Sequence, residues 1–302
     1  MLTICILLLV LPSSITNISS IIVDTLTVTL VQDTAAPSES SNAYVITSRI
    51  SNEGFFVDSG STNSTTSQLI SVYQQQVRST TKPPKFVFLI HGHPDHMGGI
   101  ALIQKSYPTT PIYVIIQQVA REAVRWIDFV CSNGVYSPAQ CTLNYIRTLR
   151  VLSSPRTQLA FNDLSARLTA MSVMVKGESS YAGMLGIASK SRAYLLFTGD
   201  AITIRSHLYV SNFFDTNTLP SSDDALCAWA GSMQSTVCSL QLGSRMSRIL
   251  PGHGPISDSF SYPREVARNI GWLRTLQTVT FNSCNATYIW SEMLRRFPDF
   301  GE

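Results

Sequence analysis

The sequence predicts an α/β fold in which two sheets lie between layers of helices. Three observations favour this fold class. Strand-like segments precede helix-like segments twice along the 302-residue chain. No repeat or low-complexity linker separates the two halves. The chain is 44% hydrophobic and only 14% charged, which is the composition of a protein that buries a sizeable core. We therefore expect one integrated domain over residues 21–302, preceded by a separate segment over residues 1–20.

The segment over residues 1–20 has the pattern of a secretory signal peptide. An apolar run from Ile4 to Leu11 is followed by Pro12 and small polar residues. The run is too short to cross a bilayer, which takes roughly 20 apolar residues. No Lys or Arg precedes it, so a buried first strand is the alternative interpretation. Because no later segment is long and apolar enough, we expect a secreted or lumenal mature protein with no stable membrane span.

The first half of the domain is expected to hold several strands before its main helix. Residues 21–31 are rich in β-branched side chains and predict a first strand, and residues 43–47 and 54–58 predict a hairpin. The continuous apolar run 86–90 predicts a strand buried on both faces. The remaining predicted elements are helices near 67–77, after Gly98 and over 117–130, and a strand over 112–116.

The helix over 117–130 has two distinct faces. Its apolar face consists of Ala120, Ala123, Val124, Ile127 and Val130. The opposite face is expected to point to water and consists of Arg121, Glu122, Arg125 and Asp128.

The second half is expected to begin with strands and to end with helices. Pro263 stands in the first turn of one of these helices, where its missing N–H leaves no hydrogen bond unmade. The predicted strands cover 168–176, 184–189, 193–198 and a segment ending at Leu250, and the predicted helices lie within 223–242, from about 262 to 278 and over 286–296.

Secretion changes how the cysteines are interpreted, because disulfides are favoured in an oxidising compartment. Cys5 leaves with the signal peptide, and pairing of near neighbours predicts the bonds Cys131–Cys141 and Cys227–Cys238, with Cys284 left over. The alternative is that all five remaining cysteines are reduced core residues.

Two glycosylation sequons agree with secretion. Asn63 and Asn285 begin Asn-x-Ser/Thr tripeptides in segments expected to be exposed. Asn17 also begins a sequon, but it lies in or beside the segment expected to be removed. We predict glycans at Asn63 and Asn285.

Three imidazoles and one carboxylate occur within six residues at the end of the buried strand. His91 and His93 alternate along an extended segment, so both rings are expected to project to the same side. Asp95 and His96 follow on the next turn. Imidazole nitrogen and carboxylate oxygen suit zinc, and suit iron or manganese less strongly. A lone histidine is usually structural, but so many polar groups at one strand end would lack partners without a metal ion.

The pattern His91-x-His93-x-Asp95-His96 resembles the signature of the metallo-β-lactamase superfamily. The resemblance covers most of the chain, from about residue 21 to residue 278, and implies the four-layer αββα sandwich of that family. Three further segments also resemble family motifs: the opening hairpin with Asn42-Ala43-Tyr44 and Asp58-Ser59-Gly60, the strand end Phe197-Thr198-Gly199-Asp200, and the final histidine motif Leu250-Pro251-Gly252-His253-Gly254-Pro255.

The resemblance implies a role for each matching residue. His91 and His93 match two ligands of a first metal ion. The ligands of a second ion are matched by Asp95, His96 and His253, and Asp200 matches the carboxylate that bridges the two. Asp95 is also implied to orient the nucleophile and to shuttle its proton. The expected cofactor is one or two zinc ions, with iron or manganese as alternatives.

One ligand of the family has no match. Family members usually carry a further first-metal histidine on a Gly-rich stretch shortly before the bridging aspartate, but residues 177–184 contain no histidine. Tyr181 is expected nearest the altered position, with Glu178 close by, so either is a candidate substitute ligand. His207 comes after Asp200, and we interpret it as a surface loop residue, with a replacement ligand as the minority alternative.

The resemblance implies metal-assisted hydrolysis of a small acyl compound. A metal ion lowers the pKa of bound water from about 15.7 to near 7, and the resulting hydroxide attacks an ester, lactone, thioester or amide carbonyl. A non-catalytic or degenerate binding protein on the same scaffold is the alternative, because of the altered position near Tyr181. A nuclease of the superfamily is disfavoured and no nucleic-acid partner is expected, since the net charge is only +3 and no basic groove is evident. No loop motif predicts the substrate, and the fold does not decide it.

Overall fold

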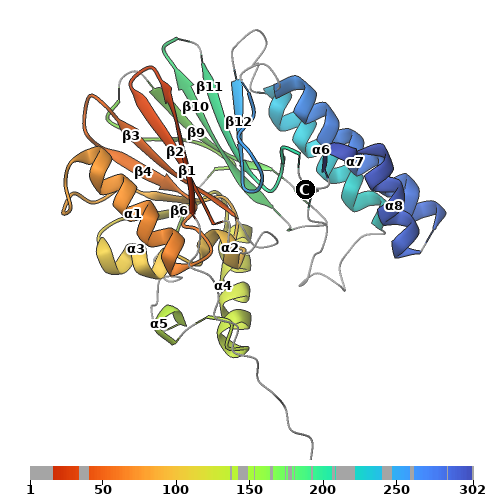
Figure 1. Cartoon of the computed structure of the whole chain (residues 1–302), viewed down its shortest axis with the longest axis horizontal. Coiled ribbons are helices and arrows are strands. Elements are labelled where there is room, and N and C mark those ends of the chain that lie inside the picture. The colour runs from red at the N-terminus through yellow and green to blue at the C-terminus, as the bar shows by residue number, and fades with distance from the viewer. Residues whose placement is uncertain are drawn as a thin grey trace, which may run out of the picture.

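Two sheets form the centre of the molecule, as Figure 1 shows. The computed structural model describes residues 16–33, 41–136, 138–141, 149–152, 154–163, 166–173, 175, 179, 181–191, 193–205, 208, 222–239, 247–258, 262–283 and 285–300. In the described residues the first sheet has seven strands in the order β1-β2-β3-β4-β5-β6-β7, and the second has five in the order β12-β11-β10-β9-β8.

The first sheet changes from antiparallel to parallel pairing at β4. Its strands are β1 (Thr16–Val23), β2 (Leu26–Asp33), β3 (Asn42–Ser48), β4 (Gly54–Val57), β5 (Val87–Leu89), β6 (Ile112–Val114) and β7 (Leu149–Val151). β1 to β4 pair antiparallel, whereas β4 to β7 pair parallel. The carboxyl ends of β4 and β5 therefore lie at the same edge of the sheet, where α/β proteins commonly bind their ligands.

The second sheet brings two further strand ends together. Its strands are β8 (Arg156–Leu159), β9 (Ala166–Val173), β10 (Ala182–Ser189), β11 (Tyr194–Gly199) and β12 (Ser247–Pro251). β8 to β11 pair antiparallel, and β11 and β12 pair parallel. Asp200 and His253 consequently follow strands that end side by side.

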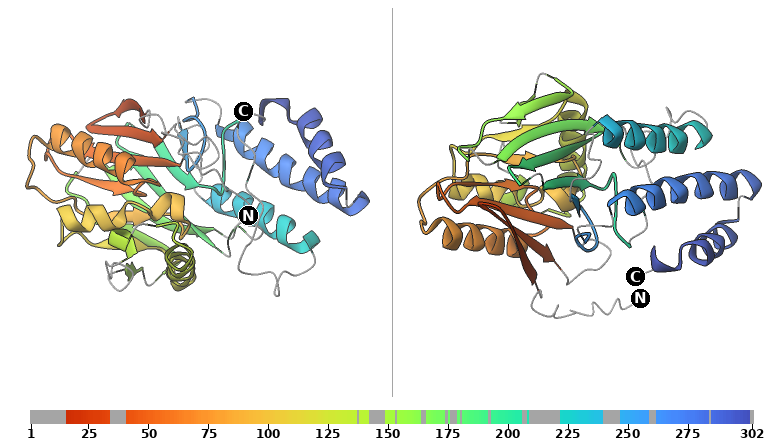
Figure 2. Two further views of the ribbon diagram at one scale, coloured as in Figure 1. Left: turned by 60° about the horizontal axis from the view of Figure 1, so that its bottom comes forward. Right: turned by 90° about the horizontal axis from the view of Figure 1, so that it is seen from above.

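Helices flank both sheets. On the side of the first sheet are α1 (Asn63–Val77), α2 (Pro94–Met97), α3 (Ile100–Ser106), α4 (Gln117–Ser132) and α5 (Pro138–Cys141), and at the other end are α6 (Ser222–Ser239), α7 (Tyr262–Asn282) and α8 (Ala286–Arg296), followed by a short 3-10 helix (Pro298–Phe300). α1 contacts β2 and β3, α6 contacts β9, and α7 contacts α6 and β12, an arrangement that Figure 2 shows from two further sides. The predicted α/β class and four-layer sandwich are thus confirmed.

Aromatic side chains join the two sheets. Tyr44 of β3 and Phe197 of β11 lie edge to face, with ring centroids 5.1 Å apart, and both are fully buried. Gly183 of β10 lies where the ring of Phe88 and the backbone of Ile90 approach, since a Cβ there would be 3.1 Å from each. Burying a large apolar side chain stabilises the fold by about 1.5–3 kcal/mol, so this seam holds the two halves of the site in register.

The strand predicted over 21–31 is wrong as a single element. It is two antiparallel strands, β1 and β2, which turn at Asp24 and Thr25. Asp24 has a φ of 52°, a left-handed conformation that Asp tolerates better than most residues, so a two-residue turn forms where we expected continuous strand. β1 also begins at Thr16, inside the segment expected to be a signal peptide. The apolar run 4–11 lies outside the described residues.

One of the two predicted disulfides is confirmed and the other is wrong. Cys131 at the end of α4 is bonded to Cys141 of α5. Cys227 is a free, exposed thiol. It stands on the same continuous helix as Cys238, and eleven residues of helix separate two Cα atoms by about 16 Å, far beyond the roughly 7 Å that a disulfide can span. Cys284 lies outside the described residues.

No helix among those that the structure describes is both long and apolar enough to cross a membrane.

Candidate metal centre

The loop after β5 presents three histidines to one side of the first sheet. His91, His93 and His96 are all buried. His93 caps α2, and Pro94 takes the first position of that helix, so one helical turn places Asp95 and His96 beside the two earlier rings. The ring centroids of His91 and His93 are 4.6 Å apart, and those of His91 and His96 are 4.1 Å apart.

The second sheet contributes Asp200 and His253 through two tight loops. Gly199 ends β11 with a φ of 52°, a conformation that favours glycine, and turns the chain so that Asp200 faces the histidines. Gly252 precedes His253 and must be glycine, because a Cβ there would lie 2.3 Å from Asp200 Oδ1. Asn42 Nδ2 donates to the carbonyls of Pro251 and Gly254, which ties the His253 loop to the first sheet.

Four side chains converge at one end of the site. Asp95 Oδ2 is 3.2 Å from His96 Nε2 and 3.1 Å from His253 Nε2. Asp200 Oδ1 is 3.3 Å from His96 Nε2, and Asp200 Oδ2 is 3.5 Å from His253 Nε2. Asp95, His96 and His253 together form one group whose donor atoms are close enough to share a metal ion.

Asp200 also belongs to a second such group, with His91 and His93. Its Oδ2 lies 3.5 Å from His91 Nε2. One carboxylate therefore faces both groups, which is the position that the sequence motif predicts for a bridging ligand.

The observed separations fit a metal ion. Ligands that bind one zinc ion at about 2.1 Å with tetrahedral geometry are about 3.4 Å from each other. The nitrogen–oxygen separations around Asp95 and Asp200 run from 3.1 to 3.5 Å. These five separations therefore match the spacing of ligands around one metal ion, and the nitrogen and oxygen donors are types that zinc accepts.

Asp58 is a member of the site that the sequence did not single out as functional. Its Oδ2 is 2.8 Å from His96 Nδ1, and its Oδ1 accepts a hydrogen bond from the Ile90 backbone N–H. A carboxylate on one ring nitrogen fixes the tautomer of a metal-binding histidine and leaves the other nitrogen free for the metal. Asp58 thus aims His96 Nε2 at the centre. Its place directly after β4, at the same sheet edge as His91, was the available signal.

Opposite charges shift the pKa values of four of these groups. Burial alone would lower the pKa of His253, but the carboxylates of Asp200 and Asp95 outweigh it and raise the pKa to about 10. Burial would also lower the pKa of His96. The carboxylates of Asp95, Asp200 and Asp58 outweigh this effect, so the pKa of His96 lies well above its usual value. Burial would raise the pKa values of Asp95 and Asp200, but the neighbouring histidines hold both well below the usual range.

Of the predicted substitute ligands, the structure describes Tyr181 alone, and no described contact brings it into this cluster. Tyr181 precedes β10 and packs against the core as a half-buried side chain. Glu178 and His207 lie outside the described residues.

Glu122 of α4 differs from its prediction. We expected it on the water-facing side of the helix, but only 13% of its side chain is exposed, and its Oε1 is 3.9 Å from His93 Nε2. The helix turns this side toward the His93 loop because Ala123 packs directly on Gly92: a Cβ at position 92 would be 2.4 Å from the Ala123 backbone nitrogen.

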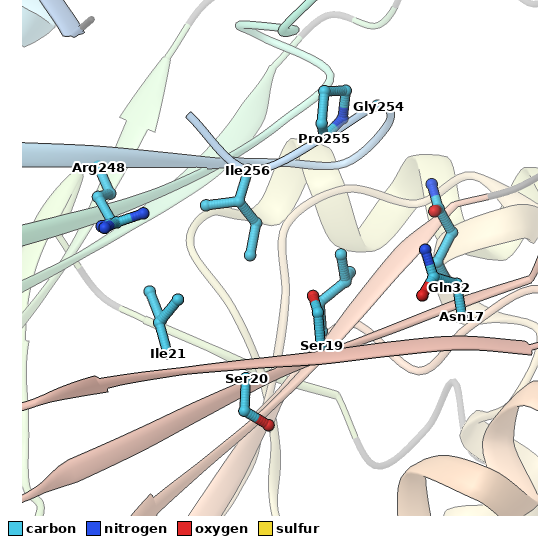
Figure 3. A pocket seen from close by; sticks show the side chains of 10 residues that line it. Asn17, Ser19, Ser20, Ile21, Gln32, Arg248, Gly254, Pro255 and Ile256 are labelled. Atoms are coloured by element: carbon cyan, nitrogen blue, oxygen red, sulfur yellow. The ribbon is translucent and has the colours of Figure 1, made fainter. Parts of the chain in front are cut away.

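The more open side of the site faces the loop after β12. Asp95 and His253 have 23% and 24% of their side chains exposed, against 0% for His91 and His96. A cavity of about 410 Å³ lies between β1–β2 and this loop (Figure 3). Its lining includes Ser19, Ile21 and Gln32 from the hairpin, with Gly254 and Ile256 from the segment that follows His253.

Both predicted glycosylation sites are on the surface. Asn63 is the exposed first residue of α1, and Asn285 is exposed and caps α8 by accepting a hydrogen bond from the Tyr288 backbone N–H through Oδ1. The amide nitrogen that would carry a glycan is not the atom used for capping.

Comparisons with known proteins agree with this architecture. Residues 37–123, which include the His91–His96 motif, match the family described as the metallo-beta-lactamase superfamily. No curated protein matches the chain in sequence.

Solved structures match over nearly their whole length. The metallo-beta-lactamase FIM-1 from Pseudomonas aeruginosa, in its mono-zinc form, is 14% identical with a TM-score of 0.57, over 87% of this chain and 98% of that one. A metallo-beta-lactamase from Pontibacter korlensis is 14% identical with a TM-score of 0.55, over 86% and 99%. The metallo-beta-lactamase DIM-1 is 16% identical with a TM-score of 0.54, over 86% and 97%. At such identities the likeness shows the fold. The resemblance inferred from the motifs is therefore confirmed, and the chain is a protein of the metallo-β-lactamase fold that carries the superfamily's motif.

Proposed function

We propose that the chain is a secreted, metal-dependent hydrolase of small acyl compounds, acting on an ester, lactone, thioester or amide carbonyl. One observation carries this proposal. Six ligand-type side chains from three strand ends of two sheets meet with donor atoms in two groups that could each hold a metal ion. The proposed occupant is zinc, in one or two ions, with iron or manganese as alternatives. When bound, such an ion makes water nucleophilic near neutral pH and polarises a carbonyl.

The chain's own residues would divide the remaining work. Asp95 combines a low pKa with partial exposure, so its carboxylate is ionised and can be reached from the open side of the site. It is placed to orient an attacking water and to accept its proton. His253 is exposed to a similar degree. None of the six ligand-type residues lines the cavity beside the segment that follows His253, so we assign this cavity only to a part of the substrate remote from the reacting carbonyl.

The proposal is tested on protein purified from culture medium. Sequencing of its N-terminus tests secretion, and we expect cleavage before Thr16, since β1 begins there. Elemental analysis should find zinc, iron or manganese, and a panel of the four acyl classes should find turnover. His93→Ala should lose metal and activity, and Asp95→Asn should lower kcat by about 100-fold or more. The exposed Asp128→Asn is the matched control. Metal-free wild-type protein, or unchanged hydrolysis by His93→Ala, would refute the assignment.

A binding protein on the same scaffold is the second candidate. It is favoured by a specific observation, the absence of histidine from residues 177–184. Metal-loaded protein that turns over none of the four acyl classes, but binds a member of one of them, would support this alternative.

A further inference from the structure

We propose that Glu122 is the additional ligand of the first metal position. It would take the place of the histidine that the sequence resemblance leads one to expect and that residues 177–184 lack. The inference rests on the proposed metal centre and names the residue that completes it. Tyr181, which the sequence suggested, has no described contact with the histidine pair, whereas Glu122 has one with His93.

The position of Glu122 follows from how α4 packs. The backbone of Ala123 lies against Gly92, the residue between His91 and His93 in the sequence. The preceding residue of the helix is therefore held beside His93, and Glu122 Oε1 comes within 3.9 Å of His93 Nε2. Two ligands of one zinc ion are about 3.4 Å apart, close to this distance. The donor atoms of His91, His93 and Asp200 already lie together, and the proposal requires the Glu122 carboxylate to move from its place beside His93 toward that group.

Ser179 orients the carboxylate. Its buried hydroxyl donates to Glu122 Oε2 at 2.7 Å, which leaves Oε1 as the oxygen on the His93 side. Ser179 lies in the same stretch, 177–184, that lacks the expected histidine. This stretch therefore still takes part in the first site, but as the group that positions a ligand from α4.

The ring of His93 is also held from α4. Trp126, one turn after Glu122, lies edge to face against it, with ring centroids 5.2 Å apart. Glu122 and Trp126 thus approach His93 from the same helix face, which fixes the imidazole relative to the carboxylate.

The resulting ligand set is chemically sufficient. It comprises His91, His93 and Glu122, with Asp200 as the carboxylate shared with the other group. Two histidines and one glutamate hold catalytic zinc in hydrolases of other folds. An acidic ligand in place of a neutral imidazole also makes the site more negative, which favours retention of a divalent cation.

The test is a Zn²⁺ titration of metal-depleted protein by chelator competition, with elemental analysis of the loaded product. Wild-type protein and the matched control Asp128→Asn should each bind two equivalents. Glu122→Gln, which keeps the shape of the side chain, should bind one equivalent as before and the other at least tenfold more weakly. Ser179→Ala should show a smaller loss at the same equivalent, because it removes only the orienting hydrogen bond. Circular dichroism checks that each variant is folded.

Two results would overturn the proposal. One is a Glu122→Gln titration identical to wild type, and the other is loss of one equivalent in Tyr181→Phe but not in Glu122→Gln. Failure of the proposed function is distinguishable: wild-type protein that binds two equivalents and hydrolyses nothing removes the hydrolase proposal and leaves the Glu122 result standing.

Discussion

Asp58 contacts both the Ile90 backbone and the His96 ring through its two carboxylate oxygens, and an unusual backbone conformation makes this possible. Its φ is 59°, and the left-handed turn directs Oδ1 to the Ile90 N–H and Oδ2 to His96 Nδ1. An asparagine tolerates the same backbone but has only one accepting oxygen, so one of these two donors would face an amide nitrogen.

We therefore expect Asp58→Asn to weaken metal binding by about 10–100-fold, the usual effect of losing such a supporting carboxylate. Its folded state should also lose about 1–3 kcal/mol, because a buried donor is left unsatisfied. The matched control is Asp24→Asn, another aspartate with positive φ, which accepts a hydrogen bond from the Ser191 N–H in an exposed turn. Metal affinity equal to wild type in Asp58→Asn would contradict the positioning role.

At the scale of elements, α4 links the His91–His96 loop to the stretch before β10. It touches Gly92 through Ala123, His93 through Trp126, and Ser179 through Glu122. The Cys131–Cys141 disulfide ties the end of the helix to α5. A displacement of α4 should therefore change the position of the His93 ring before that of the other histidines.

Gly92→Ala tests this coupling. The new Cβ would lie 2.4 Å from the Ala123 nitrogen, which is backbone and cannot rotate away, so the helix must shift. Overpacking of this kind costs about 1–3 kcal/mol, and we expect weaker binding of one metal equivalent along with it. Gly231→Ala is the control, since a Cβ there meets nothing within 4 Å on the exposed side of α6 and alanine favours helix. Denaturant unfolding and Zn²⁺ titration measure both effects, and a Gly92→Ala protein with wild-type values would disprove the packing argument.

Elements that depend on local pattern were predictable, and those that depend on partners were not. The buried run before His91 and the amphipathic repeat of α4 signal strand and helix by themselves. Glu122 was predicted to face water because helical periodicity separates apolar from polar residues. Periodicity does not show which polar residue contacts another loop. The predicted pairing of Cys227 with Cys238 failed for a related reason. The two residues are close in sequence, but one continuous helix holds them several turns apart. β7 and β8 are short and carry exposed Arg150 and Arg156, so no apolar alternation marked them.

Across the whole fold, the candidate metal centre lies at the junction between the two sheets. His91, His93, Asp95 and His96 follow β5, whereas Asp200 and His253 follow β11 and β12. The six motif residues could be assigned from the sequence because three motifs occur in family order, but their convergence depends on the Tyr44–Phe197 seam and on Asn42, which join segments far apart in the chain. A bound ion adds a direct cross-link at this seam, so its removal should loosen both halves together.

Removal of metal by a chelator should lower the thermal stability of the whole domain in a pH-dependent way. An ion present at 100 times its Kd adds about 2.7 kcal/mol, which corresponds to a fall in Tm of about 5 °C on its removal. In the metal-free protein the carboxylates of Asp200 and Asp95, which face His253 along with His96, raise the pKa of His253 to about 10. That protonated ring contributes stability that is fully present below its ordinary value of 6.5 and is lost as the pH rises through about 10.

Zinc binds only the neutral imidazole and must displace this proton, so its stabilisation should grow with pH. We expect the difference in Tm between zinc-loaded and chelator-treated protein to be larger at about pH 9 than at about pH 7. Circular dichroism melts measure it. His253→Ala removes one of the two rings whose pKa is raised, so it should reduce the pH dependence, and His96 should keep the remainder. A difference in Tm that shrinks as the pH rises would show that the metal does not displace the proton of His253, and therefore that His253 does not bind the metal.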